Sequence, residues 1–199
     1  MEKQLFEIGN HFINEQRLSI TCIALILLQV IVLFSNLGFI GAGASMSRMS
    51  DGLHNAIGIF LQPLQDLCLL ILFFALFVAL YKRNIIIPIA SYVVILLFAT
   101  TVLTFLAKFS GNNIGLLLGL ISLACYILVC ILGVKLRKTP FARLGTTFIV
   151  FSVFDIVDGL ILKGSNPIMF IISLGIMIYL ALTFKNSLST EFEVKENNQ

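Results

Sequence analysis

The stretch FSVFDIVDGL, residues 151–160, holds two carboxylates, Asp155 and Asp158, in an otherwise apolar run. A charge in hydrocarbon is costly unless it is paired, hydrated or protonated. At a spacing of three residues the two side chains share one face of a helix, and we expect that face to point into a helix bundle rather than at lipid. Close carboxylates repel each other unless a cation, a proton or a hydrogen-bond donor lies between them. The pair therefore favours binding of a proton, a cation or an amine.

A count of helical rise places a third acid at a similar depth. At about 1.5 Å per residue, Asp155 lies about 18 Å above Arg143 and Asp158 about 22 Å, while Asp66 lies about 24 Å from Lys82. Other polar residues reach a comparable level. The predicted ligand-binding residues are Asp155, Asp158, Asp66, Asn36, Thr100 and Thr101.

Structural roles are the alternative for two of these acids. Asp158 precedes Gly159 and fits the hydrated, fraying end of a helix. Asp66 follows Pro63 by three residues, which fits an acid in a first helical turn, where the helix dipole favours it. Asp155 is the deepest of the three and has the strongest claim to function.

The motif DIVDG, formed by Asp155, Asp158 and Gly159, resembles the opening of the signature of the CDP-alcohol phosphatidyltransferases, membrane enzymes that hold two metal ions on Asp residues. That signature continues with further Asp residues, whereas this chain continues as LILKGSNPIMFIISLGIM, without an acid. A two-metal site cannot be completed from these residues. We therefore expect no enzyme of this type, no metal and no cofactor.

The composition predicts a membrane protein. Of 199 residues, 59% are hydrophobic and 12% charged, and the mean hydropathy is +1.04, well outside the range of soluble domains. A net charge of +3 gives no support for nucleic-acid binding. The four cysteines lie in apolar runs without a Cys-x-x-Cys motif, which predicts free thiols.

Runs long enough to cross a bilayer predict an all-α polytopic fold. The six expected transmembrane helices are residues 18–40, 61–81, 85–107, 113–134, 144–162 and 167–184. With both termini cytoplasmic, the inner segments hold ten Lys and Arg residues and the outer ones only Arg48, Lys108 and Lys163, as the positive-inside rule requires. We expect a multi-pass protein of the plasma membrane, in a bacterium the inner membrane.

The segments beside these spans are given separate roles. Residues 1–185 form one transmembrane domain, which begins with an amphipathic interfacial helix at about 3–16 whose apolar face includes Leu5, Ile8 and Phe12. Residues 41–60 form an outer loop that lies on the membrane surface or re-enters it. Residues 186–199 are expected to be a polar, mobile cytoplasmic tail.

Two functions fit these features. The first is a small binding or transport protein with an outward-facing acidic pocket for a cation, a proton or an amine-bearing solute. The alternative is a non-enzymatic accessory or regulatory protein that associates with a membrane-protein partner or a second copy of itself. Gly115 and Gly119 carry that alternative, because their small-xxx-small spacing lets helices approach closely. The lipid bilayer is a partner in both cases.

Overall fold

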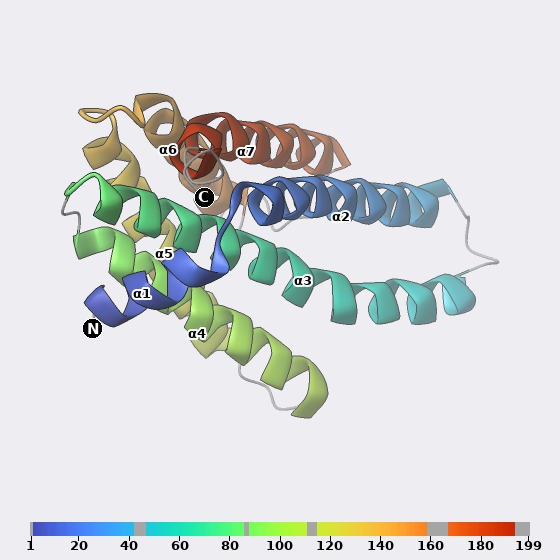
Figure 1. Cartoon of the computed structure of the whole chain (residues 1–199). Helices are drawn as coiled ribbons and strands as arrows, with labels where there is room; N and C mark the ends of the chain where they lie inside the picture. Colours follow the sequence, from blue (N-terminus) through green and yellow to red (C-terminus); the bar gives the residue numbers. More distant parts are fainter. Residues whose placement is uncertain (1, 42–46, 86–87, 111–114, 159–166, 194–199) are drawn as a thin grey trace.

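The computed structural model describes residues 2–41, 47–85, 88–110, 115–158 and 167–193. These residues form seven helices and no strand (Figure 1). The helices are α1 (Glu2–Phe12), α2 (Glu15–Gly41), α3 (Ser47–Lys82), α4 (Pro88–Ser110), α5 (Gly115–Leu136), α6 (Ala142–Val157) and α7 (Pro167–Glu193). The all-α prediction is confirmed.

Five helices are long and apolar enough to cross a membrane, which makes this a multi-pass membrane protein. They are α2, α3, α4, α5 and α7. The described part of α6 has 16 residues and rises about 24 Å, less than the hydrocarbon thickness of about 30 Å. The last residues of the expected fifth span, 159–162, lie outside the described part of the chain.

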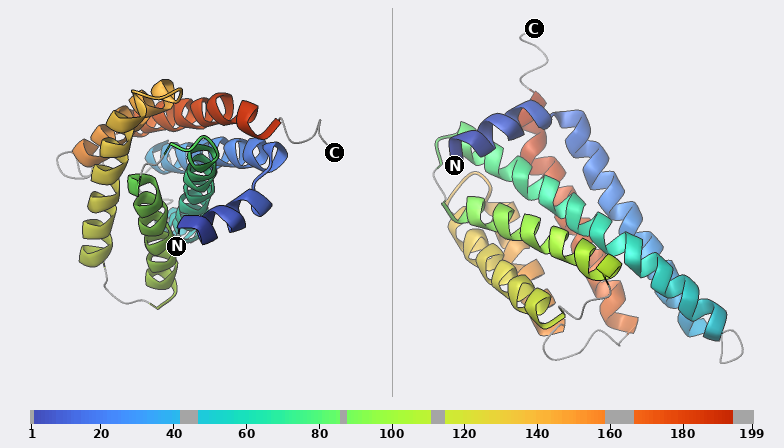
Figure 2. Two further views of the ribbon diagram at one scale, coloured as in Figure 1. Left: turned by 60° about the vertical axis from the view of Figure 1, so that its left-hand side comes forward. Right: turned by 90° about the horizontal axis from the view of Figure 1, so that it is seen from below.

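The chain order of the helices is also their order in space. From α2 to α7 each helix packs on the next, and α7 packs back on α2, which closes a ring of six helices (Figure 2). α3 is the most enclosed, because it also contacts α1 and α7. Its residues 75–80 are buried on every side of the helix, as expected for an apolar helix inside a bundle.

The length of α3 corrects two expectations. Residues 47–60 were expected in an outer loop, but they are the first part of a continuous helix of 36 residues, about 54 Å long. α2 and α3 therefore extend together beyond the other helices at the end away from the N-terminus (Figures 1 and 2). Asp66 is not in a first turn, because the helix begins at Ser47 and passes through Pro63 without ending.

α1 lies across α3, and residues 13–14 connect it to α2. Phe6 stacks on Tyr81 with ring centroids 4.4 Å apart, and Gly9 lies so close to α3 that a side chain there would overlap Val78. Asn14 begins α2 by accepting a hydrogen bond from the Arg17 backbone N–H at 2.8 Å. α1 ends at Phe12, earlier than the residue 16 that the sequence predicted for the end of the interfacial helix.

The apolar face predicted for α1 is divided between protein and surroundings. Phe6, Gly9 and Ile13 face the protein, whereas Ile8 and Phe12 are 62% and 57% exposed. Two large apolar side chains exposed next to a transmembrane bundle are what an interfacial helix presents to lipid.

α7 corrects the predicted tail. The helix continues eight residues past Lys185 to Glu193, so residues 186–193 are folded rather than part of a mobile tail. The reason is an apolar stripe with a spacing of four residues, which buries one side of the helix. Its members are Leu180, Phe184, Leu188 and Phe192, each at most 4% exposed. Residues 194–199 lie outside the described part.

Three phenylalanines join α3, α6 and α7 in the centre of the bundle. The Phe73 and Phe148 rings stack at 4.8 Å, and Phe184 contacts them at 5.5 and 5.4 Å. All three side chains are at most 2% exposed. We call Phe73, Phe148 and Phe184 the aromatic plug, because they fill the middle of the bundle at close-packed ring distances.

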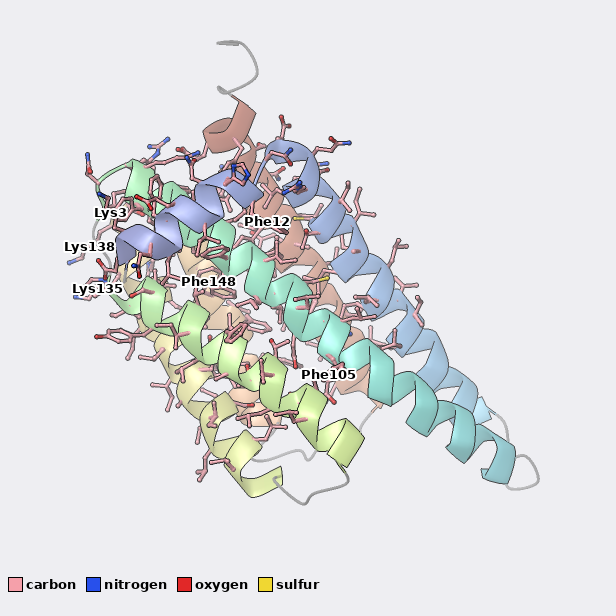
Figure 3. The ribbon with its side chains drawn as sticks, turned by 60° about the horizontal axis from the view of Figure 1, so that its bottom comes forward. Lys3, Phe12, Phe105, Lys135, Lys138 and Phe148 are labelled. Carbon is pink, nitrogen blue, oxygen red and sulfur yellow. The ribbon has the colours of Figure 1, made fainter. Side chains whose placement is uncertain are left out.

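Basic residues gather at one end of the bundle, which we call the basic end. It contains the beginning of α1, the α3–α4 turn and the α5–α6 connection. Figure 3 shows Lys3, Lys135 and Lys138 at this end and Phe105 toward the opposite end.

Arg83 at the basic end pairs with Glu191 of α7. Its Nε donates a hydrogen bond to the Glu191 carboxylate at 2.8 Å, and one of its terminal nitrogens donates a second. These bonds raise the pKa of the Arg83 guanidinium, which is charged at physiological pH even without them.

α5 and α6 approach each other closely at Gly133 and Gly145. A Cβ atom on either glycine would lie 2.6 Å from the carbonyl oxygen of the other, closer than real Cβ contacts. Only glycine lets these two backbones meet at this distance.

Gly133→Ala should therefore lower the free energy of unfolding by about 1–3 kcal/mol, because backbone must move to admit the methyl group. Gly119→Ala on the same helix is the matched control: its Cβ would meet nothing within 4 Å, and stability should be unchanged or higher. Thermal unfolding in detergent measures both variants. Equal losses in the two would contradict the packing described here.

Candidate functional site

A cavity of about 250 Å³ lies inside the ring, and Asp66 and Asp155 both line it. The two carboxylates come from α3 and α6, which are far apart in sequence. α2, α5 and α7 add polar side chains to the same wall. These are Gln29, Tyr126 and Ser173, with Gln62 and Gln65 of α3 completing the polar lining.

Tyr126 of α5 lies beside Asp155 of α6. Both line the cavity, and the phenol hydroxyl is near enough to the carboxylate to interact with it electrostatically. The Tyr126 ring also meets Phe151 of α6 in an edge-to-face contact with centroids 5.9 Å apart. α5 and α6 are thus joined at the site by one polar and one aromatic contact.

A second cavity of about 90 Å³ adjoins the first and carries hydroxyl groups. Asp66, Gln62, Leu69, Tyr126 and Phe151 line both cavities and so form the wall between them. The smaller cavity adds Thr100, Thr104 and Ser122 from α4 and α5. Thr104, only 3% exposed, lies near the Asp66 carboxylate, so its hydroxyl is a polar partner for that acid.

The described residues that line the two cavities include two carboxylates and no Lys, Arg or His. Hydroxyl donors from Tyr126 and Thr104 reduce the cost of a carboxylate here, but they supply no positive charge. The site is therefore left with negative charge that a proton or a cationic guest can neutralise. The aromatic plug lies on the basic side of both cavities, because Phe73, Phe148 and Phe184 each come between the cavity residues of their helix and the basic end.

The structure brings together three of the six predicted ligand-binding residues. Asp66, Asp155 and Thr100 line the cavities, whereas Thr101 lines neither. Both threonine hydroxyls donate to the Leu97 carbonyl oxygen, at 2.9 Å from Thr100 and 2.7 Å from Thr101. Asn36 lies in α2, and its side chain is outside the described part.

Asp158 is at the end of α6 and does not line the larger cavity. It is the C-terminal cap residue, and its backbone N–H donates to the carbonyl oxygens of Asp155 and Phe154. Its Oδ1 atom is buried without a hydrogen-bond partner within the described structure. Asp158 therefore stands at a helix end, as the structural alternative expected, but its buried Oδ1 atom does not match a hydrated end.

Gly119, one of the two glycines predicted for helix packing, makes no contact with another helix in the described part of the chain. A Cβ on Gly119 would meet nothing within 4 Å. Its neighbours Leu117 and Leu120 are 49% and 58% exposed, so this face of α5 is open. Gly115 begins α5, and its surroundings lie outside the described part. A role for these glycines between chains stays a prediction.

The sequence reasoning missed several residues of the site, although the same count of helical rise finds them. Gln29 is twelve residues from Arg17, and Ser173 is twelve from Lys185, which puts both about 18 Å from the basic boundary, the depth of Asp155. Thr104 is sixteen residues from the start of α4 at Pro88 and so matches the 24 Å depth of Asp66. Tyr126 carries a weaker signal, because a single Tyr in an apolar span is ordinary.

Metal ligands do not cluster in the described residues, where no group of three or more His, Cys, Asp or Glu side chains is placed to hold a metal ion. All four cysteines are free thiols, as predicted. No protein-family model matches the sequence, and comparisons with curated proteins and with solved structures found no match. The site has to be interpreted from its own chemistry.

Asp155→Asn should raise the free energy of unfolding by on the order of 1 kcal/mol, or about 2–4 °C in melting temperature, because it removes a buried charge that no described basic residue balances. Asp155→Glu keeps the charge and should give no such gain. Thermal unfolding of the ligand-free protein in detergent measures both. A clear loss of stability in Asp155→Asn would mean that the carboxylate is a structural element of the bundle.

Proposed function

We propose that this protein is a small integral membrane binding or transport protein that takes a cation, a proton or an amine-bearing solute into an acidic pocket. The observation that carries the proposal is the placement of Asp66 and Asp155 on one internal cavity whose described lining contains no basic residue. A protein that only needed a stable bundle would gain nothing from two such carboxylates, because apolar residues of similar volume pack at lower cost.

The size and lining of the larger cavity favour a small organic or hydrated cation. A volume of about 250 Å³ is below the range of drug-sized pockets, roughly 300–1,000 Å³, and far above the share of one water in the liquid, about 30 Å³. Tyr126 and Phe151 offer aromatic rings, which attract cations as well as apolar groups. The amides of Gln29, Gln62 and Gln65 offer carbonyl oxygens that accept hydrogen bonds from an ammonium group.

The direction of access follows from the aromatic plug and from charge. The plug fills the bundle on the basic side of the cavities, while Gln62, a lining residue farther from the basic end than Asp66, is exposed. Under the positive-inside rule the basic end is cytoplasmic. We therefore propose six spans in the plasma membrane, with both termini in the cytoplasm and a pocket that opens outward.

Cysteine labelling tests this topology. In intact cells a membrane-impermeant maleimide should label Asn112→Cys, in the connection between α4 and α5, and should label Lys138→Cys, in the α5–α6 connection, only after permeabilisation. The wild-type protein, whose cysteines are buried or partly buried, gives the background. Labelling of Lys138→Cys in intact cells would reverse the proposed orientation.

Ligand-induced thermal stabilisation tests the pocket. With a panel of alkali cations, primary amines and quaternary amines, a true ligand at about one hundred times its Kd should stabilise the wild type by about 2.7 kcal/mol, roughly 5–10 °C. Asp155→Asn should lose this shift, because it removes the charge that recognises the ligand. Thr100→Val, which removes a hydroxyl from the smaller cavity, should alter it less.

Thr101→Val is the control for these variants, because it makes the same substitution next to Thr100 at a side chain that lines neither cavity. It should retain the full shift. The proposal fails if no cation, amine or pH change shifts the melting temperature of the wild type, or if Asp155→Asn responds as the wild type does.

A further inference from the structure

A separate cavity of about 640 Å³ lies at the basic end, between the start of α6 and the last turns of α7. Two arginines line it: Arg83 from the end of α3 and Arg143 from the first turn of α6. Glu191 is the only acid among the described lining residues. None of its described lining residues lines either acidic cavity, so the two are different places with opposite charge.

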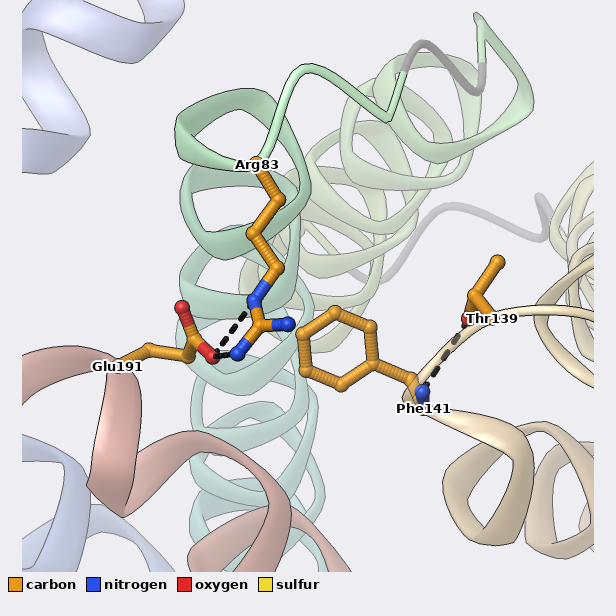
Figure 4. A network of polar contacts seen from close by, with 4 residues as sticks. All are labelled: Arg83, Thr139, Phe141 and Glu191. Carbon is orange, nitrogen blue, oxygen red and sulfur yellow. Dashed lines mark hydrogen bonds and ion pairs between the residues drawn. The ribbon is translucent and has the colours of Figure 1, made fainter.

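The charges in this cavity leave one positive group without an acid. Figure 4 shows the Arg83 guanidinium between the Glu191 carboxylate and the Phe141 ring, which its central carbon approaches to 5.6 Å. Glu191 therefore neutralises Arg83, while Arg143 is exposed. Phe141 and Ala142, at the start of α6, line this cavity, so the positive end of the α6 dipole lies beside it. An anion is the guest that this arrangement attracts.

α7 supplies a polar stripe along the length of the cavity. Tyr179, Thr183, Ser187 and Glu191 recur every fourth residue and all line it, next to the apolar stripe that is buried in the bundle. From Tyr179 to Glu191 this wall rises about 18 Å, much more than a free inorganic anion needs. The guest that fits is long and lies parallel to the helix.

The end of the cavity farthest from the basic boundary opens to the membrane. Tyr179 and Leu182 are 60% and 45% exposed on a helix that is apolar enough to span a bilayer, so lipid chains contact them. Asn186 and Arg143, nearer the boundary, are exposed and polar. The end of the cavity at Tyr179 and Leu182 can hold one acyl chain, and the cationic end at Arg143 can hold its phosphate headgroup.

We propose that this cavity is a binding site for an anionic phospholipid, with its phosphate at Arg143 and the start of α6 and its acyl chain against Leu182 and Tyr179. The site is independent of the function proposed for the acidic pocket. Basic pockets between transmembrane helices on the cytoplasmic side are general binding places for anionic headgroups.

Native mass spectrometry of the full chain from mixed micelles tests this proposal. With equimolar phosphatidylglycerol and phosphatidylcholine, the wild type should retain phosphatidylglycerol preferentially. Arg143→Gln should weaken that retention by on the order of fivefold, the factor expected for one basic group near a membrane surface. Arg137→Gln is the matched control, because it removes the same charge from an exposed residue at the same end that does not line the cavity.

Two further variants should change the retention of phosphatidylglycerol in opposite directions, and they test the site even if Arg143→Gln does not fold. Asn186→Asp adds a negative charge to an exposed lining residue and should weaken retention of phosphatidylglycerol. Glu191→Gln removes the only described acid of the cavity and should strengthen it. Neither variant should change retention of phosphatidylcholine.

The proposal is overturned if Arg137→Gln and Arg143→Gln weaken retention equally, since that result indicates surface charge rather than a site. It is also overturned if phosphatidylglycerol shows no preference over phosphatidylcholine in the wild type. Inorganic phosphate and glycerol phosphate form the last arm. If either displaces the lipid at equal concentration, the cavity recognises a free anion and not a phospholipid.

Discussion

Two carboxylates at membrane depth, Asp66 and Asp155, constrain the rest of this bundle. Hydrocarbon offers no hydrogen bonds, so each acid has to be enclosed by protein that supplies polar partners. The ring from α2 to α7 does this by bringing Tyr126 to Asp155 and Thr104 to Asp66. All six helices from α2 to α7 contribute lining residues to the two cavities.

The aromatic plug divides the molecule into two chemical halves. The acidic cavities lie on one side of it and the basic end lies on the other. The cavity lined by Arg83 and Arg143 begins at the basic end and runs along α7 as far as Tyr179. Three rings packed at 4.8 to 5.5 Å exclude water from the space between, so opposite charges can be kept apart over a short length of chain. Gly133 and Gly145 help to keep this geometry, because their backbone contact fixes α5 against α6 next to Phe148.

The sequence predicted that the helices exist more accurately than where they end. It also predicted the two acids of the site more accurately than the residues that surround them. Every predicted span has a helix in the structure, since apolar runs of this length have no other way to satisfy the backbone in lipid. The errors were at polar-looking segments. Residues 47–60 and 186–193 carry enough polar residues to look like loop and tail, yet both continue a helix, and for the second the reason is the stripe that ends in Leu188 and Phe192.

The same contrast holds for the site. A count of helical rise brought Asp66, Asp155 and Thr100 to one level, but a depth says nothing about rotation around a helix axis. Thr101 has nearly the depth of Thr100 and faces elsewhere, and Gly119, which has the spacing of a packing residue, meets no neighbour in the chain. Gly133 and Gly145 make the real contact, although twelve residues separate them and no motif joins them.

The sequence by itself determined that this chain is helical, that it belongs in a membrane and that it carries acids at a defined depth. These properties depend only on composition and on distance along the chain, which decide whether a segment is apolar and long enough to cross a bilayer as a helix. Only the tertiary structure decided which polar side chains share a cavity and that a separate cavity lined by two arginines begins at the basic end. Both depend on how each helix is turned toward its neighbours, and that rotation is set by side-chain packing between segments far apart in sequence.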